Sequence, residues 1–243
     1  MPASVDVVIP VYNEEKDLPV CVEKLSAFLN ENLPNPWRIL IADNGSTDRT
    51  LAVCQELSDE YPHVAYTHLD QKGRGRALKQ AWQESEADIV SYMDVDLSTN
   101  LRHFLQLVAA LENNYDIAIG SRLMPESRVT RSFKRELTSR GYNMLIKTFF
   151  WGHRIHDAQC GFKGMTRRAV KALVPLVVDN HWFFDTELLL IAEHNGFKIK
   201  EIPVEWADDP DTRVKILSTA WEDVKGLMRL RFGGIPRVKA EHI

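Results

Sequence analysis

The sequence is poor in cysteine, has no long apolar run and carries no excess of basic charge. Its three cysteines, Cys21, Cys54 and Cys160, lie far apart and form no CxxC pair, which indicates a reducing compartment. No apolar run reaches the length of a membrane span, and the N-terminus lacks the basic region of a signal peptide. A net charge of −4, without a basic tail, argues against a general nucleic-acid binder. We therefore expect a cytoplasmic protein, one that could still work at a membrane surface.

Apolar segments alternate with amphipathic ones through the first half of the chain. Segments with strand character lie at 5–11, 38–42, 63–69, 88–93 and 115–121. Helical spacing of apolar residues follows the first of them, at Leu18, Val22, Leu25 and Leu29. Strand–helix alternation of this kind predicts an α/β fold, with a mostly parallel sheet flanked by helices and a site at the carboxyl ends of the strands.

The second half of the chain is less regular. Here we expect helices at 128–151, 183–195 and 218–232 and a strand at 197–206. The 243 residues are enough for one large α/β domain or two small ones. Because there is no linker, repeat or low-complexity segment, we predict a single domain.

Two carboxylates, Asp94 and Asp96, follow the apolar strand at 88–93. Alternation along a strand places residues i and i+2 on one face, so both carboxylates would point into one space. Like charges held this close repel unless a cation lies between them. Oxygen ligands suit Mg²⁺ or Mn²⁺, which usually hold phosphates as well. A solvated loop with two acidic residues is the alternative, and the position after a buried strand favours the metal site.

Other strand ends bring polar groups and glycine to the same edge of the sheet. The first strand ends in 10–14 (PVYNE), the second in 43–46 (DNGS), and 72–75 (KGRG) follows the third. An aspartate at a strand end can accept a hydrogen bond from a ribose hydroxyl or a base N–H. The glycines let backbone N–H groups approach a pyrophosphate, and Lys72 or Arg76 adds positive charge. Together these groups predict a nucleotide-diphosphate site with a metal. The missing third glycine argues against a dinucleotide fingerprint, and the lack of a GxxxxGK[ST] motif excludes a P-loop.

Several motifs resemble those of the family 2 inverting glycosyltransferases with the GT-A fold. They are 8–15 (VIPVYNEE), 43–48 (DNGSTD), 72–75 (KGRG) and 93–97 (MDVDL). A second set is similar to the polyprenyl-phosphate hexose synthases, which are the dolichyl-phosphate mannose synthases and glucosyltransferases. These segments are 120–122 (GSR), 135–140 (RELTSR), 157–163 (DAQCGFK) and 184–188 (FDTEL). The QCGFK segment is closer to the glucosyltransferase branch. The resemblance implies one GT-A domain over 1–243, with a nucleotide-binding half (1–122) and an acceptor-binding half (123–243).

The resemblance also implies roles for individual residues. The nucleoside would be held by Pro10, Tyr12, Glu14 and Asp43. The metal and the diphosphate would be held by Asp94 and Asp96, with Lys72, Gly73 and Arg76 beside the phosphates. The acceptor phosphate would be met by Arg122, Arg135 and Ser139, with Arg213 closing over the phosphates. Asp185 would serve the sugar or acceptor side.

Two positions depart from the family pattern. Asn44 stands where a second aspartate is common, but Asp43 remains. Ser98 stands where some mannose synthases have a metal-binding glutamine, which leaves the third protein ligand of the metal open.

The acceptor implied by the resemblance is a polyprenyl phosphate, and the donor is UDP-glucose or GDP-mannose. A phosphate monoester is mostly dianionic at neutral pH, because its second pKa is about 6, and it can attack without a general base. One alternative is a family 2 enzyme with a sugar or protein hydroxyl acceptor, which would need a base such as Asp185 or Asp157. Another is a nucleotide-sugar-binding domain without catalysis, against which the aspartate pair and the arginines argue.

The last helix has two interpretations. It sets Leu217, Trp221, Val224 and Met228 against Lys225, Arg229 and Arg231. Core packing and contact with an anionic membrane surface are equally compatible with this pattern. Because basic residues exceed acidic ones from residue 213 onward, we predict peripheral association with the cytoplasmic face of a membrane.

Overall fold

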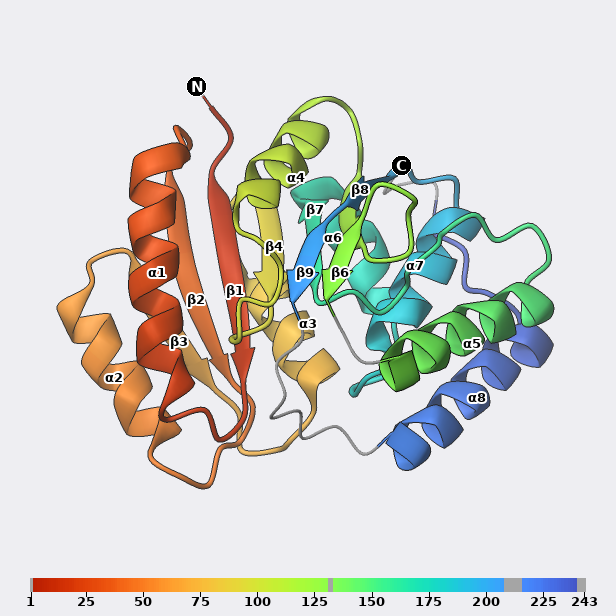
Figure 1. The fold of residues 1–243 in the computed structure, drawn as a ribbon, viewed down its shortest axis with the longest axis horizontal. Coiled ribbons are helices and arrows are strands. Elements are labelled where there is room, and N and C mark those ends of the chain that lie inside the picture. Colours follow the sequence, from red (N-terminus) through yellow and green to blue (C-terminus); the bar gives the residue numbers. More distant parts are fainter. Residues whose placement is uncertain (1, 131–132, 208–215, 240–243) are drawn as a thin grey trace.

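The computed structural model describes residues 2–130, 133–207 and 216–239, without the side chains of 133–138 and 216–219. A seven-stranded sheet in the order β3-β2-β1-β4-β7-β5-β8 forms its centre (Figure 1). Its strands are β1 (Val5–Val11), β2 (Trp37–Asp43), β3 (Val64–His68), β4 (Ile89–Met93), β5 (Ile117–Ser121), β7 (Phe162–Thr166) and β8 (Ile199–Pro203). A second sheet pairs β6 (Arg128–Thr130) with β9 (Glu205–Ala207) in parallel.

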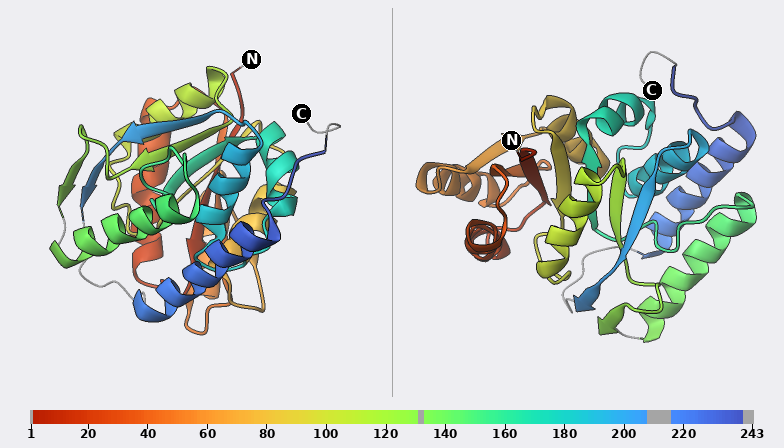
Figure 2. Two further views of the ribbon diagram at one scale, coloured as in Figure 1. Left: turned by 90° about the vertical axis from the view of Figure 1, so that its right-hand side faces the viewer. Right: turned by 90° about the horizontal axis from the view of Figure 1, so that it is seen from above.

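Helices cover both faces of the central sheet (Figure 2). They are α1 (Asp17–Asn32), α2 (Thr50–Glu60), α3 (Arg74–Glu84), α4 (Arg102–Glu112), α5 (Phe133–Phe149), α6 (Arg167–Leu173), α7 (Phe184–His194) and α8 (Ile216–Gly233), with a 3-10 turn at Val174–Leu176. The apolar stripes of α1, α2 and α4 pack on one face, and those of α3, α6 and α7 on the other. Among the described residues, no helix is both long and apolar enough to cross a bilayer.

The first half follows the sequence prediction. Each expected strand and helix is present, with ends that differ by only a few residues. Both β4 and β5 are buried along their whole length, which explains why they are apolar apart from Ser91 and Ser121. The predicted α/β class with a mostly parallel sheet is confirmed.

The second half differs from the prediction at four places, the first of which is α6, a helix that was not predicted. The expected helix at 128–151 begins only at Phe133, because Arg128–Thr130 forms β6 against β9. The expected strand at 197–206 is two strands, β8 and β9, which belong to different sheets. The sequence reading also missed β7, which runs antiparallel between β4 and β5.

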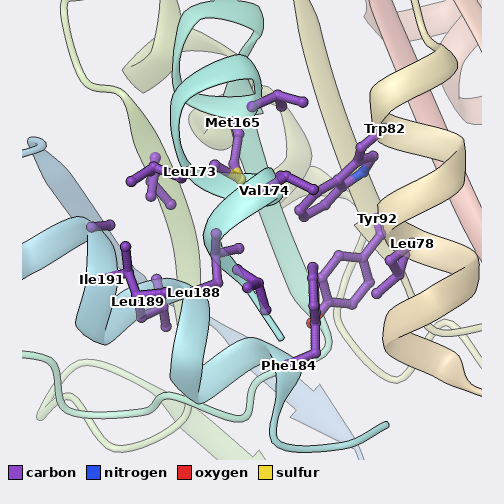
Figure 3. Close-up of a cluster of buried hydrophobic side chains, with 14 of the residues drawn as sticks. Leu78, Trp82, Tyr92, Met165, Leu173, Val174, Phe184, Leu188, Leu189 and Ile191 are labelled. Carbon is purple, nitrogen blue, oxygen red and sulfur yellow. The ribbon is translucent and has the colours of Figure 1, made fainter. Parts of the chain in front are cut away.

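A cluster of buried rings ties β4 to α3 and α7 (Figure 3). The ring centroid of Trp82 on α3 lies 5.8 Å from that of Tyr92 on β4 and 5.9 Å from that of Phe184 on α7. Because these rings fix the start of α7 beside β4, the residue after Phe184, Asp185, is brought to the hydroxyl of Tyr92.

Candidate functional site

The two predicted metal ligands lie in a turn directly after β4. The strand ends at Met93, and the N–H of Leu97 donates to the carbonyl of Asp94 at 3.1 Å. The premise that strand alternation aligns Asp94 with Asp96 is therefore wrong, because the chain has already left the strand. Asp94 is half-exposed, and Asp96 is exposed and accepts a hydrogen bond from the N–H of Ser98 at 2.9 Å.

The carboxylate of Asp94 rests against Gly161, the residue before β7. Since β7 is antiparallel to β4, its beginning lies beside the end of β4, and the N–H of Asp94 donates to the carbonyl of Gly161 at 3.2 Å. A Cβ atom at Gly161 would lie only 1.7 Å from Oδ2 of Asp94. Glycine at position 161 therefore makes the space in which this carboxylate sits.

Arg74, at the start of α3, links Asp94, which follows β4, to Asp185 on α7. Its guanidinium donates to Oδ1 of Asp94 at 3.0 Å and to Oδ2 of Asp185 at 2.7 Å. It also lies 4.8 Å from the ring centroid of Tyr92 and 4.9 Å from that of Trp182. Although burial acts to lower it, Tyr92, Asp94 and Asp185 hold the pKa of Arg74 well above its usual value.

Asp185 is buried among hydrogen-bond donors. Its Oδ1 accepts from the hydroxyl of Tyr92 at 2.5 Å and lies 3.0 Å from Nζ of Lys163. Burial acts to raise the pKa of Asp185, but Lys163 and Arg74 outweigh burial and hold the pKa below its usual range. Asp185 is thus a stable anion that orients cations rather than a free carboxylate.

The oxygen donors after β4 fit a hard divalent cation. The described residues contain no group of three His, Cys, Asp or Glu side chains that could hold a metal. Mg²⁺ is often bound through one or two carboxylates, with substrate phosphates and waters as its other ligands. Asp94 in its Gly161 cradle and the exposed Asp96 are suited to that role, and the cradle fixes where the first carboxylate stands.

The predicted nucleoside side gathers around the ends of β1 and β2. Asp43 is completely buried, and its carboxylate accepts from the N–H of Ser46 at 3.2 Å and contacts Nδ1 of His68 at 2.6 Å. His68, which is partly exposed, thus forms the surface over Asp43. Nζ of Lys72 lies 3.5 Å from the ring centroid of Tyr12. This contact joins Tyr12, predicted to hold the nucleoside, to Lys72, predicted to lie beside the phosphates.

The remaining donor-side residues have mainly local contacts. Pro10 lies in β1 opposite Ala42. The backbone N–H of Glu14 donates to the hydroxyl of Thr50 at 2.8 Å. The N–H of Gly73 donates to the side chain of Asn44, so Asn44 holds the glycine turn. Arg76 donates to the carbonyls of Gln71 and Lys72, at 3.3 and 3.1 Å.

Of the residues predicted to meet the acceptor phosphate, the structure describes the side chains of Arg122 and Ser139. Arg122 forms a two-pronged ion pair with the buried Asp157, at 2.7 and 2.9 Å. Against the effect of burial, Arg122 holds the pKa of Asp157 below its usual range. Ser139 lies half-buried in α5. The side chain of Arg135 and the whole of Arg213 lie outside the described residues.

Asp94 and Asp185 are joined by Arg74, Lys163 and Tyr92 into one ion network. Sequence reasoning missed these last three members. Arg74 lies within the recognised KGRG turn, yet positive charge was assigned to its neighbours Lys72 and Arg76. Lys163 lies within the recognised DAQCGFK segment, and Tyr92 lies two residues before Asp94. The recognised motifs thus contain Arg74 and Lys163, but they did not indicate which side chain of each segment turns inward.

A further buried carboxyl group lies on α8. Oδ2 of Asp223 accepts from Nε2 of Gln159 at 3.0 Å, and Oδ1 has no hydrogen-bond partner among the described residues. Burial raises the pKa of Asp223 to about 7, and the negative charges of Asp179, Glu222 and Asp185 act in the same direction.

Comparison with known proteins tests the resemblance seen in the sequence. The glycosyl transferase family 2 model matches residues 6–174. Glycosyltransferase AglD of Haloferax volcanii is 39% identical over 219 residues, which are 88% of this chain and 34% of that protein. Dolichyl-phosphate beta-glucosyltransferase ALG5D of Trichomonas vaginalis is 33% identical over 224 residues, 87% of this chain and 68% of that protein. The chain thus spans about a third of AglD and about two thirds of ALG5D.

Solved structures share the fold. Glucosyl-3-phosphoglycerate synthase from Mycobacterium tuberculosis, in complex with uridine-diphosphate, matches with a TM-score of 0.71 at 17% identity, over 96% of this chain and 81% of that one. Its complex with Mn²⁺ and UDP-glucose matches with a TM-score of 0.67 at 17% identity, over 96% and 80% of the two chains. Together with the family match over most of the sequence, the shared fold confirms the resemblance: the chain belongs to glycosyl transferase family 2.

Proposed function

We propose that this chain is a metal-dependent glycosyltransferase that moves a hexose from a nucleotide diphosphate sugar to a polyprenyl phosphate, with inversion. The observation that carries the acceptor class is that both candidate bases, Asp185 and Asp157, are buried in ion pairs. Their lowered pKa values make them weak proton acceptors, whereas a hydroxyl acceptor needs a base. A phosphate monoester needs none, since it is already mostly dianionic at neutral pH.

In the proposed transfer, an acceptor phosphate oxygen forms a bond to the anomeric carbon of the sugar. The bond from that carbon to the diphosphate breaks, and the nucleotide diphosphate leaves with the electron pair. A divalent cation, when bound at Asp94 and Asp96, would supply positive charge to the diphosphate. Arg74 fixes Asp94 relative to Asp185, so the donor side and the acceptor side keep one relative geometry.

Glucose is the hexose that the relatives favour. Two of them, from Trichomonas vaginalis and Homo sapiens, are dolichyl-phosphate beta-glucosyltransferases by name, at 33% and 32% identity. The QCGFK segment supports the same branch, and we propose UDP-glucose as the donor, with GDP-mannose as the competitor to be tested.

A donor and acceptor screen tests this function. The protein is incubated with Mn²⁺, either UDP-glucose or GDP-mannose, and either a short polyprenyl phosphate or the corresponding polyprenol. We expect a hexosyl polyprenyl phosphate, identified by mass, from UDP-glucose and the phosphate alone. Transfer to the polyprenol or to a sugar hydroxyl, without transfer to the phosphate, would contradict the proposed acceptor.

We also propose that α8 contacts the membrane in which a polyprenyl phosphate resides. The inward face of α8 contains Asp223, Leu227 and Leu230. Trp221 and Met228 are 61% and 45% exposed, so interpreting them as core residues is wrong. Phe232 is 80% exposed, and Nζ of Lys225 lies 5.6 Å from the ring centroid of Trp221. The helix lies beside α5 at one end of the molecule (Figures 1 and 2). Aromatic and basic side chains on one exposed surface suit the interface of an anionic bilayer.

The double substitution Trp221→Ser and Phe232→Ser is expected to weaken binding to anionic vesicles at least about tenfold. Burying one large apolar side chain contributes roughly 1.5–3 kcal/mol, and 1.4 kcal/mol corresponds to a factor of ten. Co-sedimentation at low and high salt measures the effect. The matched control is Val20→Ser, an exposed apolar residue on α1, which covers the other face of the sheet. Equal binding of the double variant and the unchanged protein would rule out α8 as the contact.

A further inference from the structure

Trp182 lies beside Arg74, the residue that joins Asp94 to Asp185. It lies in the segment before α7, three residues before Asp185, and it is 41% exposed although it is one of the largest side chains in the chain. Its ring centroid lies 4.9 Å from the guanidinium carbon of Arg74, which is itself paired with Asp94 and Asp185. Trp182 therefore partly covers a buried ion network while keeping a large surface toward solvent.

The segment that carries Trp182 is held against the glycine turn at the start of α3. The N–H of Arg76 donates to the carbonyl of Asn180 at 3.1 Å. A Cβ atom at Gly73 would lie 2.7 Å from that same carbonyl oxygen, and one at Gly75 would lie 2.7 Å from Cβ of Phe184. The absence of side chains at both glycines thus permits this close approach.

The same segment is also tied to α7. The N–H of Asp179 donates to the buried carboxylate of Glu187 at 2.8 Å, and the N–H of His181 donates to Asp179 at 2.7 Å. Glu187 is in turn paired with Arg229 of α8 at 2.8 Å. With anchors on α3 and α7, the backbone around Trp182 is positioned by contacts on both sides, so the indole is preorganised rather than a loose surface group.

We propose that Trp182 is the residue against which the donor hexose packs, and that it thereby distinguishes a nucleotide sugar from the bare nucleotide diphosphate. The inference rests on the proposed function, in which the diphosphate lies at Asp94. The guanidinium of Arg74 spans the distance from Asp94 to Asp185. A hexose attached to the diphosphate and directed toward the acceptor half therefore passes this guanidinium, which Trp182 covers.

The chemistry of the two partners is complementary. A hexopyranose has faces of C–H groups and a rim of hydroxyls, and an indole offers a broad apolar surface whose face is electron-rich. Ligand sites commonly combine such aromatic walls with a few polar groups that fix orientation. One part of the indole is occupied by Arg74, and the exposed remainder is available to the sugar.

Calorimetric titration with UDP and with UDP-glucose, in the presence of Mn²⁺, tests the inference. For Trp182→Ala we expect UDP-glucose to bind about tenfold more weakly while UDP binds within twofold of the unchanged protein. Trp182→Phe should recover most of the loss, because it keeps an aromatic face. The control is Trp151→Ala, which removes an exposed tryptophan from the segment after α5 and should alter neither affinity.

The outcomes separate this inference from the proposed function. An equal loss for UDP and UDP-glucose would mean that Trp182 only shields Arg74, and unchanged affinity for both would mean that it does not contact the sugar. A change confined to the KM for polyprenyl phosphate would assign Trp182 to the lipid. Each of these results overturns the inference and leaves the proposed function standing. If the unchanged protein binds neither UDP-glucose nor, in a parallel titration, GDP-mannose, the proposed function fails and the inference falls with it.

Discussion

A single methyl group added at Gly161 is expected to lower hexose transfer by about a hundredfold. In Gly161→Ala the new Cβ would stand 1.7 Å from Oδ2 of Asp94, so the carboxylate has to leave its present position. A displacement of about 1 Å at a reacting centre can cost on the order of 10² in rate. The measurement is kcat at saturating donor and acceptor over a range of Mn²⁺ concentrations, in which we expect the dependence on Mn²⁺ to weaken as well.

The control for this substitution is Gly141→Ala. Gly141 lies in α5, and beyond its chain neighbours and the adjacent turns of helix backbone a Cβ there would meet no described atom within 4 Å. Because alanine is favoured over glycine in a helix by about 1 kcal/mol, Gly141→Ala should be slightly more stable and fully active. If Gly161→Ala retained the normal rate and the normal Mn²⁺ dependence, Asp94 could not be a ligand in the position described.

The substitution Asp223→Asn is expected to stabilise the protein at alkaline pH. Burial raises the pKa of Asp223 from 3.8 to about 7, so between these values the folded chain holds a proton that the unfolded chain has released. The contribution of the Asp223 carboxyl group to the free energy of unfolding is therefore fully present below about pH 4 and is lost as the pH rises through about 7. Asparagine cannot ionise, so the stability advantage of the variant should grow by roughly 3 kcal/mol between about pH 5 and about pH 8.

Urea unfolding of both proteins at the two pH values measures this difference. Other groups titrate in the same range, but they do so in both proteins and cancel in the comparison. Glu23→Gln is the control, since it removes an exposed carboxylate from α1, which does not act on the pKa of Asp223. Glu23→Gln should shift stability by a few tenths of a kcal/mol at most, as is usual for surface changes. A constant difference between Asp223→Asn and the unchanged protein across this pH range would show that Asp223 is ionised throughout.

The first half of the fold was predictable because most of its strands are buried on both faces. Runs such as those of β1 and β4 are apolar apart from Asp6 and Ser91, and they alternate with clear helical patterns. The strand β7 gave no such signal. It contains Gly164 and Lys163, and Lys163 is buried through its ion pair with Asp185, a contact that no local pattern can indicate. Likewise β6 is a strand because it pairs with β9, far along the chain.

The candidate site was predictable as a set of segments, and individual side chains were not. Lys72, Arg74 and Arg76 occupy one turn, and only the folded chain reveals that Arg74 turns toward Asp94. On α8, the hydrophobic pattern left two interpretations of Trp221 open, core packing and contact with a membrane surface. The folded chain leaves Trp221 exposed, and the inward face includes Gly226, whose missing side chain accommodates the ring of Phe183, and the buried Asp223. In both cases the packing partner decided the orientation.

The antiparallel strand β7 has a consequence for how the protein is made. During synthesis the edge of β4 that β7 later covers emerges together with Asp94, while Gly161, Lys163 and Asp185 have not yet been translated. At about 5–20 residues per second, that edge remains unpaired on the ribosome for several seconds. An open, apolar strand edge invites pairing with another chain. The nascent polypeptide is therefore prone to associate with other chains during this time. The risk ends when β7 has been translated and pairs with β4.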